Sequence, residues 1–242
     1  MKNQLKSQRT VSRLLWLCLF SSWATAQPLH VGITAGVPLT DFFVAGAGGS
    51  RAFCYCFARY SSVPHRFTVG PTIEADLPFG FAAEVNVLYK RFDYSWVGES
   101  GIAPRIEAAG LTTGNSWEIP LLLKRRFISH SVRPYVLGGP VVRHVTGLHQ
   151  SSNEVIYGYL GDFPVQCSGP CLSFRRVESN SPSELRKRWY PGVSVGVGIE
   201  ARAHFLRISP EIRYTRWTAN SAPTFGLYFH GNQVEVLVGV SF

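Results

Sequence analysis

The chain ends in Asn232-Gln233-Val234-Glu235-Val236-Leu237-Val238-Gly239-Val240-Ser241-Phe242, with an apolar side chain at every even position after Asn232. Side chains on a strand point alternately to opposite faces, so four valines and the terminal phenylalanine share one face. The other face is mostly polar or small. The pattern predicts a strand with one face in an apolar environment, which fits either a membrane barrel or a soluble sheet.

The opposite end of the chain has the features of a removable signal peptide. Residues 1–13 contain four bases and no acid, residues 14–20 form a short apolar run, and Ala24-Thr25-Ala26 matches an A-x-A cleavage site. We expect cleavage after Ala26, which leaves 27–242 as one mature domain. Removing the four bases lowers the formal net charge from +9 to +5, so no nucleic-acid partner is expected.

Composition and segment length favour strands in the mature domain. The chain has 23 glycines, one methionine and 13% aromatic residues, a balance typical of many strands and turns. No apolar stretch after residue 26 approaches the ~20 residues of a membrane helix. Eight segments have about the length of a tilted transmembrane strand and repeat the alternating pattern, namely 29–37, 66–77, 81–92, 115–127, 133–145, 191–203, 206–217 and 232–242.

The connections between these segments alternate between long and short. Three are short and four are long, the long ones being 38–65, 93–114, 146–190 and 218–231. Short periplasmic turns and long extracellular loops are typical of outer-membrane barrels, whereas a soluble β-sandwich has no reason to place every long connection at one end. The sequence therefore predicts an all-β fold, an eight-stranded antiparallel transmembrane β-barrel with short periplasmic turns and long extracellular loops.

Aromatic residues gather near the predicted strand ends, where a membrane barrel meets its two water interfaces. The expected inner girdle comprises Phe79, Phe81, Phe127, Phe205 and Phe242. The expected outer girdle comprises Tyr89, Tyr94, Trp96, Trp117, Trp189, Tyr190, Tyr214 and Trp217.

If the apolar face is directed to lipid, the charged strand residues face the lumen. An eight-stranded barrel is just wide enough to be filled by its own side chains, so we expect these charges to pair in a structural network, with a narrow pore as the alternative. The segment 133–145 is apolar on both faces, so the direction of Arg143 stays open. The expected network comprises Glu74, Asp76, Glu84, Lys90, Glu118, Lys124, Arg126, Glu200, Arg202, Arg207, Glu211, Arg213 and Glu235.

Four cysteines lie in two of the predicted long loops, Cys54 and Cys56 in the first and Cys167 and Cys171 in the third. An even number of cysteines in an oxidising compartment predicts disulfides, and three connectivities are open. The close spacing of Cys54 and Cys56 strains a direct bridge, which favours two bridges between the loops over local pairing. A four-cysteine metal site is the alternative, but we expect no metal and no cofactor.

The sequence contains no recognisable catalytic motif. His144 and His149 with Ser151 and Ser152 come nearest to an esterase-like site, but no acid falls at a suitable place beside them, so we expect no enzymatic activity. The basic run Arg186-Lys187-Arg188 is interpreted as a solvated loop, or alternatively as a contact for lipopolysaccharide phosphates.

Stretches such as Tyr89-Lys90-Arg91-Phe92 and Pro210-Glu211-Ile212-Arg213-Tyr214, within this strand pattern, resemble the small outer-membrane β-barrel family of Gram-negative bacteria, the OmpA-like or porin-family barrel domains. The terminal Phe242 is similar to the signal by which such barrels are recognised for insertion. The resemblance implies the cell outer membrane as location, with its lipid, lipopolysaccharide and the barrel assembly machinery as partners. It leaves two roles open: a structural or surface-interaction protein, or a small-solute channel. No extracellular partner is indicated.

Overall fold

The computed structural model describes residues 28–50, 56–100, 105–127, 132–157, 172–182, 185, 187–203, 205–218 and 227–242. The regular elements are almost entirely strands. They are β1 (Leu29–Pro38), β2 (Phe43–Val44), β3 (Gly46–Ser50), β4 (Cys56–Val63), β5 (Thr68–Leu77), the 3₁₀ turn η1 (Pro78–Gly80), β6 (Phe81–Asn86), β7 (Leu88–Ser100), β8 (Arg105–Arg126), β9 (Val132–Tyr157), β10 (Leu172–Ser179), β11 (Trp189–Ala203), β12 (Leu206–Trp217), β13 (Tyr228–Phe229) and β14 (Asn232–Ser241).

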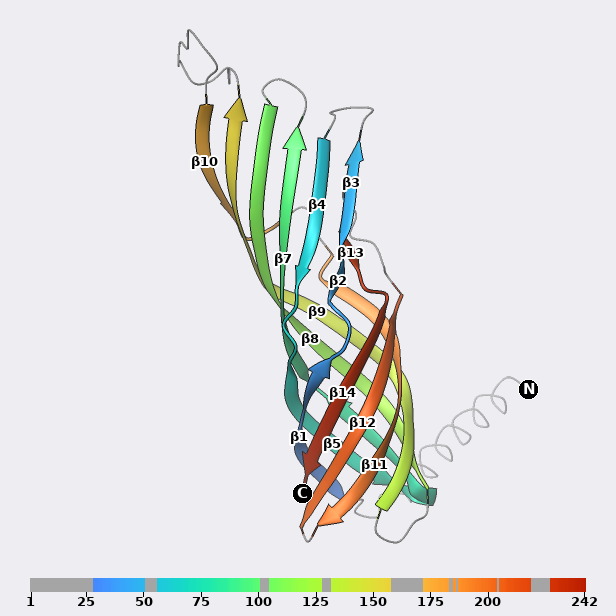
Figure 1. The fold of residues 1–242 in the computed structure, drawn as a ribbon. Coiled ribbons are helices and arrows are strands. Elements are labelled where there is room, and N and C mark those ends of the chain that lie inside the picture. The colour runs from blue at the N-terminus through green and yellow to red at the C-terminus, as the bar shows by residue number, and fades with distance from the viewer. Residues whose placement is uncertain are drawn as a thin grey trace, which may run out of the picture.

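Eight stretches of strand close into an antiparallel barrel (Figure 1). The ring runs β1, β5, β6 with β7, β8, β9, β11, β12 and β14, and then returns to β1. β6 and β7 are one stretch of chain interrupted at Val87, whose N–H donates to the carbonyl of Pro71 at 3.0 Å. The predicted eight-stranded antiparallel barrel is confirmed.

The last strand pairs with the first and so completes the ring. Val37 lies opposite Val236 and Gly32 opposite Ser241. Val31 and Phe242 exchange backbone hydrogen bonds of 3.3 and 3.1 Å, so the ladder reaches the last residue. The C-terminus and η1 lie at the same end of the barrel (Figure 1), which is the end predicted to be periplasmic.

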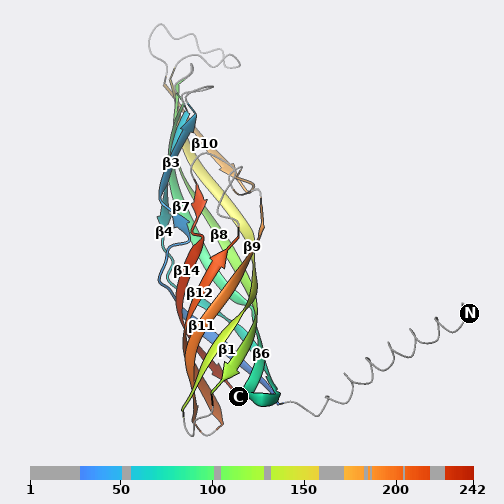
Figure 2. The ribbon, with the colours of Figure 1, turned by 90° about the vertical axis from the view of Figure 1, so that its right-hand side faces the viewer.

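The structure differs from the prediction in the long connections, because much of their length is strand. β7, β8 and β9 continue well beyond the barrel and, with β3, β4 and β10, form a sheet in the order β3-β4-β7-β8-β9-β10. We call this sheet the extension; it stands above one end of the barrel (Figures 1 and 2). The prediction ended each strand at the length that spans hydrocarbon, but backbone pairing continues wherever a neighbouring strand supplies partners, as between Trp96 and Gly110.

The outer wall of the barrel is apolar. Ile119, Leu121 and Leu123 on β8 point outward and are 40–54% exposed, while the residues between them are buried inside. From Trp117 to Phe127, ten steps of ~3.4 Å at a tilt of ~40° span about 25 Å along the barrel axis, which is the height of the apolar band of outer-membrane barrels. In the part of the chain that the structure describes, no helix is long and apolar enough to cross a membrane.

An aromatic row follows the outer end of this wall. Tyr89 lies opposite Trp117, Trp117 opposite His144, and His144 opposite Trp189 on successive strands. The ring centroids of Tyr89 and Trp117 are 5.1 Å apart, and His144 stacks on Trp189 at 4.0 Å. At the other end of the wall, four phenylalanines are half exposed or more: Phe79, Phe127, Phe205 and Phe242.

Three members of the predicted outer girdle point into the barrel instead. Tyr94, Tyr190 and Trp217 are at most 2% exposed. Each lies an even number of residues from inward-facing polar residues on its own strand and therefore shares their face; Trp217, for example, lies four residues after Arg213. The prediction was therefore wrong for these residues, because it used distance from the strand end and ignored which face the side chain occupies.

Candidate functional site: the barrel lumen and its mouth

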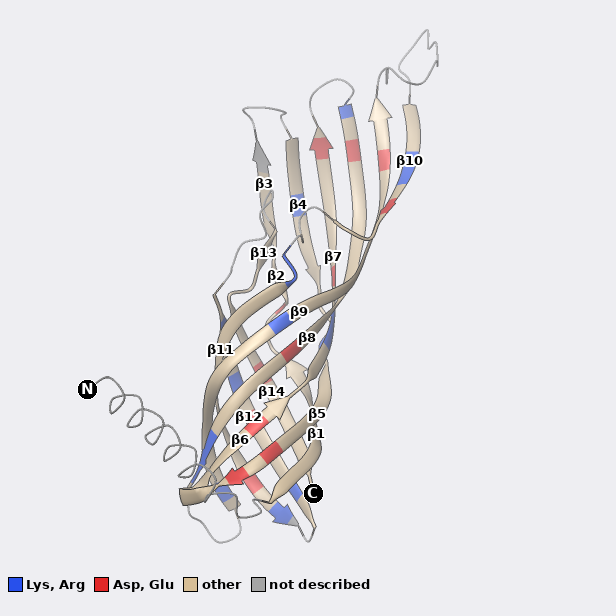
Figure 3. Cartoon of the chain, turned by 180° about the vertical axis from the view of Figure 1, so that it is seen from behind, with Lys and Arg blue, Asp and Glu red and all other residues tan. Residues whose placement is uncertain are grey.

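The inner half of the lumen contains a cluster of ion pairs around Glu74; the charged residues of the strands are coloured in Figure 3. Glu74 Oε2 lies 2.7 Å from Lys124 Nζ, and its Oε1 lies 2.7 Å from Arg207 Nη1. Arg126 pairs with Glu74 as well, and its Nε donates to Glu200 Oε2 at 2.8 Å. Because each base contacts more than one acid, the buried charges are neutralised as a network, which is what a low-dielectric interior requires.

A second cluster near the outer mouth is centred on Glu118. Lys90 Nζ lies 2.6 Å from Glu118 Oε2 and 2.6 Å from Glu235 Oε1. Arg143 Nη2 donates to Glu118 Oε1 at 2.8 Å and to Gln233 Oε1 at 2.5 Å. The five side chains come from four different strands and tie them together across the lumen.

Arg213 lies between these two clusters. Its Nη2 lies 2.5 Å from Glu211 Oε1 and 3.4 Å from Glu84 Oε1. The Tyr135 hydroxyl donates to Glu211 Oε2 at 3.0 Å, and Glu84 also pairs with Lys124. The charged residues thus form a nearly continuous column along the barrel.

Of the thirteen residues predicted for the lumen, all but Asp76 and Arg202 are buried, and each of these eleven makes an ion pair. The Asp76 side chain is 23% exposed and pairs with Arg126 at 2.5 Å. Arg202 is 47% exposed and reaches Glu200 at 3.5 Å, so it belongs to the rim. Sequence reasoning left Arg143 unassigned, because the residues before it are apolar on both faces of the strand; the structure places it inside the barrel, opposite Glu118.

The side chains leave little free space in the lumen. An internal cavity lined by Thr34, Thr72, Glu74 and Lys124 has a volume of about 20 Å³. One water needs roughly 10–15 Å³ on this measure. The cavity therefore has room for a single water molecule.

The outer mouth is covered by an aromatic plug. We use this name for Phe42, Phe43 and Phe229, which come from two of the connections. Strands β2 and β13 pair there, with Phe43 opposite Phe229, and both side chains are 2% exposed. Their rings pack on residues of the barrel wall: Phe43 lies 5.0 Å from Tyr94, and Phe229 lies 4.6 Å from Tyr190.

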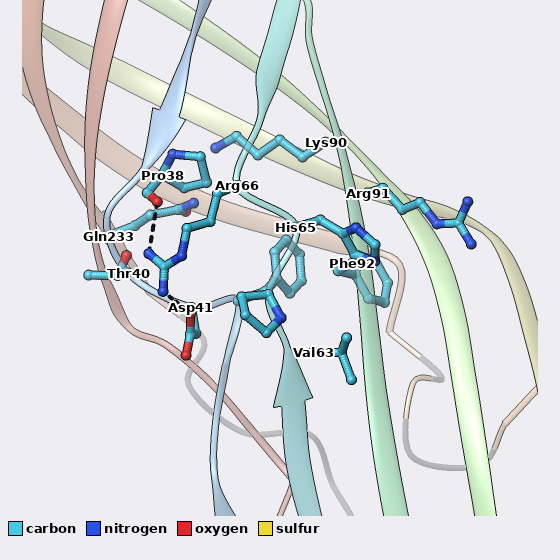
Figure 4. A pocket seen from close by; sticks show the side chains of 12 residues that line it. Pro38, Thr40, Asp41, Val63, His65, Arg66, Lys90, Arg91, Phe92 and Gln233 are labelled. Atoms are coloured by element: carbon cyan, nitrogen blue, oxygen red, sulfur yellow. Dashed lines mark hydrogen bonds and ion pairs between the residues drawn. The ribbon is translucent and has the colours of Figure 1, made fainter.

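Arg66 fixes the segment that leads from β1 into the plug (Figure 4). Its guanidinium donates to the Pro38 carbonyl at 3.4 Å and to Asp41 Oδ1 at 3.1 Å. The adjacent His65 contacts Asp93 Oδ2 through Nε2 at 2.8 Å. The cavity between this segment and β7 measures about 20 Å³.

Of the four residues considered for an esterase-like site, the two histidines line one hollow on the outside of the barrel, and Ser152 lies on the other face of β9. His144 is stacked on Trp189, and His149 Nδ1 lies 3.0 Å from Asn180 Oδ1. Ser152 points to the other face, where its hydroxyl donates to the carbonyl of Val177 at 3.4 Å. Among the described residues, no three His, Cys, Asp or Glu side chains are grouped so that they could hold a metal ion.

Cys56, the first residue of β4, is disulfide-bonded. Cys54, Cys167 and Cys171 lie outside the described residues, as do Arg186 and the predicted signal peptide, so the connectivity and the cleavage site stay predictions. Phe242 is 69% exposed at the inner rim, and its role in assembly also stays a prediction.

No protein-family model matches this sequence, and no curated protein matches it. Among solved structures the chain is similar to Neisserial surface protein A, with 14% identity over 88% of this chain and 95% of that one and a TM-score of 0.34. It is also similar to the N-terminal β-barrel domain of Pseudomonas aeruginosa OprF, with 14% identity over 88% of this chain and 97% of that one and a TM-score of 0.29. A third similar structure is the attachment invasion locus protein Ail of Yersinia pestis, with 10% identity over 88% of this chain and 98% of that one and a TM-score of 0.27. Such identities concern the fold alone, and none of the three bears on the function of this chain.

Proposed function

We propose that the protein is an integral outer-membrane β-barrel that is exported through a cleaved signal peptide, is closed to solutes, and carries the extension as a surface for interaction outside the cell. The filled lumen is the observation that carries this proposal. Buried ion pairs occupy the barrel interior, the aromatic plug covers its mouth, and the lumen cavity has a volume of only about 20 Å³.

The outer wall supports the membrane location. Its exposed leucine, isoleucine and valine side chains lie between two levels of aromatic residues, as expected where a barrel crosses hydrocarbon and meets both headgroup layers. In water this wall would be an apolar patch far larger than soluble monomers expose. The contact with lipid, the recognition of Phe242 by the assembly machinery and membership of the OmpA-like group of barrels are part of the proposal.

The extension supports a role in surface interaction. One row across its outward face runs Phe57, Glu99, Glu107, Val155 and Phe174 on successive strands. Phe174 is 80% exposed and Phe57 is 42% exposed. Aromatic side chains are enriched at protein interaction surfaces. We therefore favour a non-enzymatic binding role over transport.

Two measurements test the proposal. Fractionation of expressing cells should recover the protein with outer membranes, as a band whose gel mobility changes on heating because a closed barrel resists detergent unfolding. In planar bilayers the same preparation should give no steady single-channel openings. Recovery in the soluble periplasm would contradict the membrane location. Steady openings would contradict the closed barrel and support the alternative function, a small-solute channel.

A further inference from the structure

An open hollow of about 620 Å³ lies on the outside of the barrel, beside the aromatic row. Its polar lining consists of His144, His149, Asn180, Arg188 and a threonine. None of the described residues that line it is a carboxylate. Among the described residues, the lining thus combines two imidazoles and a guanidinium with no carboxylate.

A β-bulge explains why both histidines reach the same hollow. Residues five apart on a regular strand point to opposite faces, but the β8–β9 register shifts between Thr113 and Asn115. Gly147 lies in this irregular stretch with a φ of +57°, and a Cβ there would approach Asn115 Nδ2 to 2.7 Å. The extra residue reverses the facing of the side chains after it, so His144 and His149 end on one side.

Backbone contacts hold the basic groups in place. The Val145 N–H donates to the Arg188 carbonyl at 2.8 Å, and the Tyr190 hydroxyl donates to the Lys187 carbonyl at 2.6 Å. His144 is stacked on Trp189, and its Nδ1 is enclosed with no hydrogen-bond partner among the described residues. These contacts fix the backbone around Arg188 and the orientation of the His144 ring at the hollow.

We propose that this hollow binds the phosphate of a phosphorylated lipid headgroup in the outer leaflet. The inference rests on the membrane location proposed above, because the aromatic row then sets the headgroup level. A guanidinium group donates charge-assisted hydrogen bonds to phosphate oxygens, and an imidazole N–H can donate to them as well. In the same row as His144, Trp189 (54% exposed) and Trp117 (38% exposed) offer apolar surface to the lipid.

The test uses the full chain, purified in a neutral detergent and also inserted into phosphatidylcholine vesicles, as wild type and as Arg188→Gln, His149→Ala and Arg91→Gln variants. Arg91 is the matched control: its side chain is half exposed on β7 near the same aromatic row, but it already contacts Asp93 at 3.5 Å. Native mass spectrometry of the detergent sample measures the binding of three probes: diphosphorylated lipid A, its dephosphorylated form and inorganic phosphate.

We expect one tightly held molecule of diphosphorylated lipid A, with affinity reduced about tenfold by Arg188→Gln or His149→Ala and unchanged by Arg91→Gln. Equal binding by all variants, equal binding of the dephosphorylated lipid, or equally tight binding of inorganic phosphate would overturn the inference. Insertion into the vesicles and heat-modified gel mobility are scored separately. If both are normal and binding is absent, only this inference fails; if insertion fails, the proposed function fails.

Discussion

The guanidinium of Arg143 lies 3.9 Å from the ring centroid of Trp217, and so one buried charge joins the ion-pair network to the aromatic residues at the mouth. The same side chain donates to Glu118 and to Gln233, and Phe42 of the plug lies 4.3 Å away. Closure of the mouth and neutralisation of the lumen therefore depend on each other at this residue.

Arg143→Met should destabilise the barrel by about 3–5 kcal/mol, because it leaves Glu118 buried with one cationic partner fewer. Urea unfolding of vesicle-inserted protein, followed by gel mobility, measures the change. The control Arg91→Met removes an exposed arginine and should stay within about 0.5 kcal/mol of wild type. Similar losses in both variants would show that Arg143 does not hold the two regions together.

Val236→Arg should lower the free energy of unfolding in vesicles by about 2–4 kcal/mol, because it places a charge against hydrocarbon. Val236 is 39% exposed on the barrel wall, whereas Val97 is 56% exposed on the extension. Val97→Arg makes the same substitution at a site that we place in water, and a change of less than about 0.5 kcal/mol is expected there. Equal costs would mean that the membrane boundary is misplaced.

The barrel could be predicted from sequence because apolar and polar residues alternate along most of its strands, and this local pattern shows which side chains face outward and which face the lumen. The terminal strand shows this best, since Leu237 is fully buried while Val236 and Val238 are exposed, as its parity requires. The same rule would have turned Tyr94, Tyr190 and Trp217 inward. It was overridden by the expectation that aromatic residues near strand ends face the headgroups.

The plug and the extension could not be predicted in this way. Phe43 and Phe229 are 186 residues apart in sequence and pair through a strand two residues long, which is too short to show any period. In the extension, strand β3 is Gly46-Ala47-Gly48-Gly49-Ser50, a composition that indicates a turn or loop by itself. Only the neighbouring strand β4, which supplies the hydrogen-bonding partners, makes it a strand.

Gly114→Ala should loosen the packing beneath the plug. A Cβ at Gly114 would lie 2.5 Å from Phe92 Cζ and 2.6 Å from Leu148 Cδ2, and both side chains are enclosed in the same cluster. Overpacking of this kind costs about 1–3 kcal/mol, measurable by urea unfolding. Gly138→Ala is the control, because the atoms nearest to a Cβ there are 3.5 Å away, which is an ordinary van der Waals contact. The packing account fails if the two alanines have the same effect.

The last prediction concerns the cysteines of the extension. Cys56 is disulfide-bonded and begins β4, which is separated from β10 by β7, β8 and β9. At ~4.8 Å per strand spacing, β4 and β10 lie about 19 Å apart across the sheet. The Cα atoms joined by a disulfide lie within about 7 Å of each other, so a bridge from Cys56 to Cys167 or Cys171 requires the connection before β10 to reach across the sheet. Such a bridge would tie opposite sides of the extension together, whereas local pairing would fix only single hairpin ends.

We expect non-reducing peptide mapping of exported protein to show a fragment containing Cys56 linked to one containing Cys167 or Cys171. A peptide closed by Cys167 and Cys171 alone would contradict this pairing. Each long-range bridge should stabilise the extension by ~2–4 kcal/mol, so reduction should make it sensitive to protease. The barrel should keep its heat-modified gel mobility after reduction, because its closed ladder and its ion pairs contain no cysteine. Loss of that band on reduction alone would show that the disulfides hold the barrel itself.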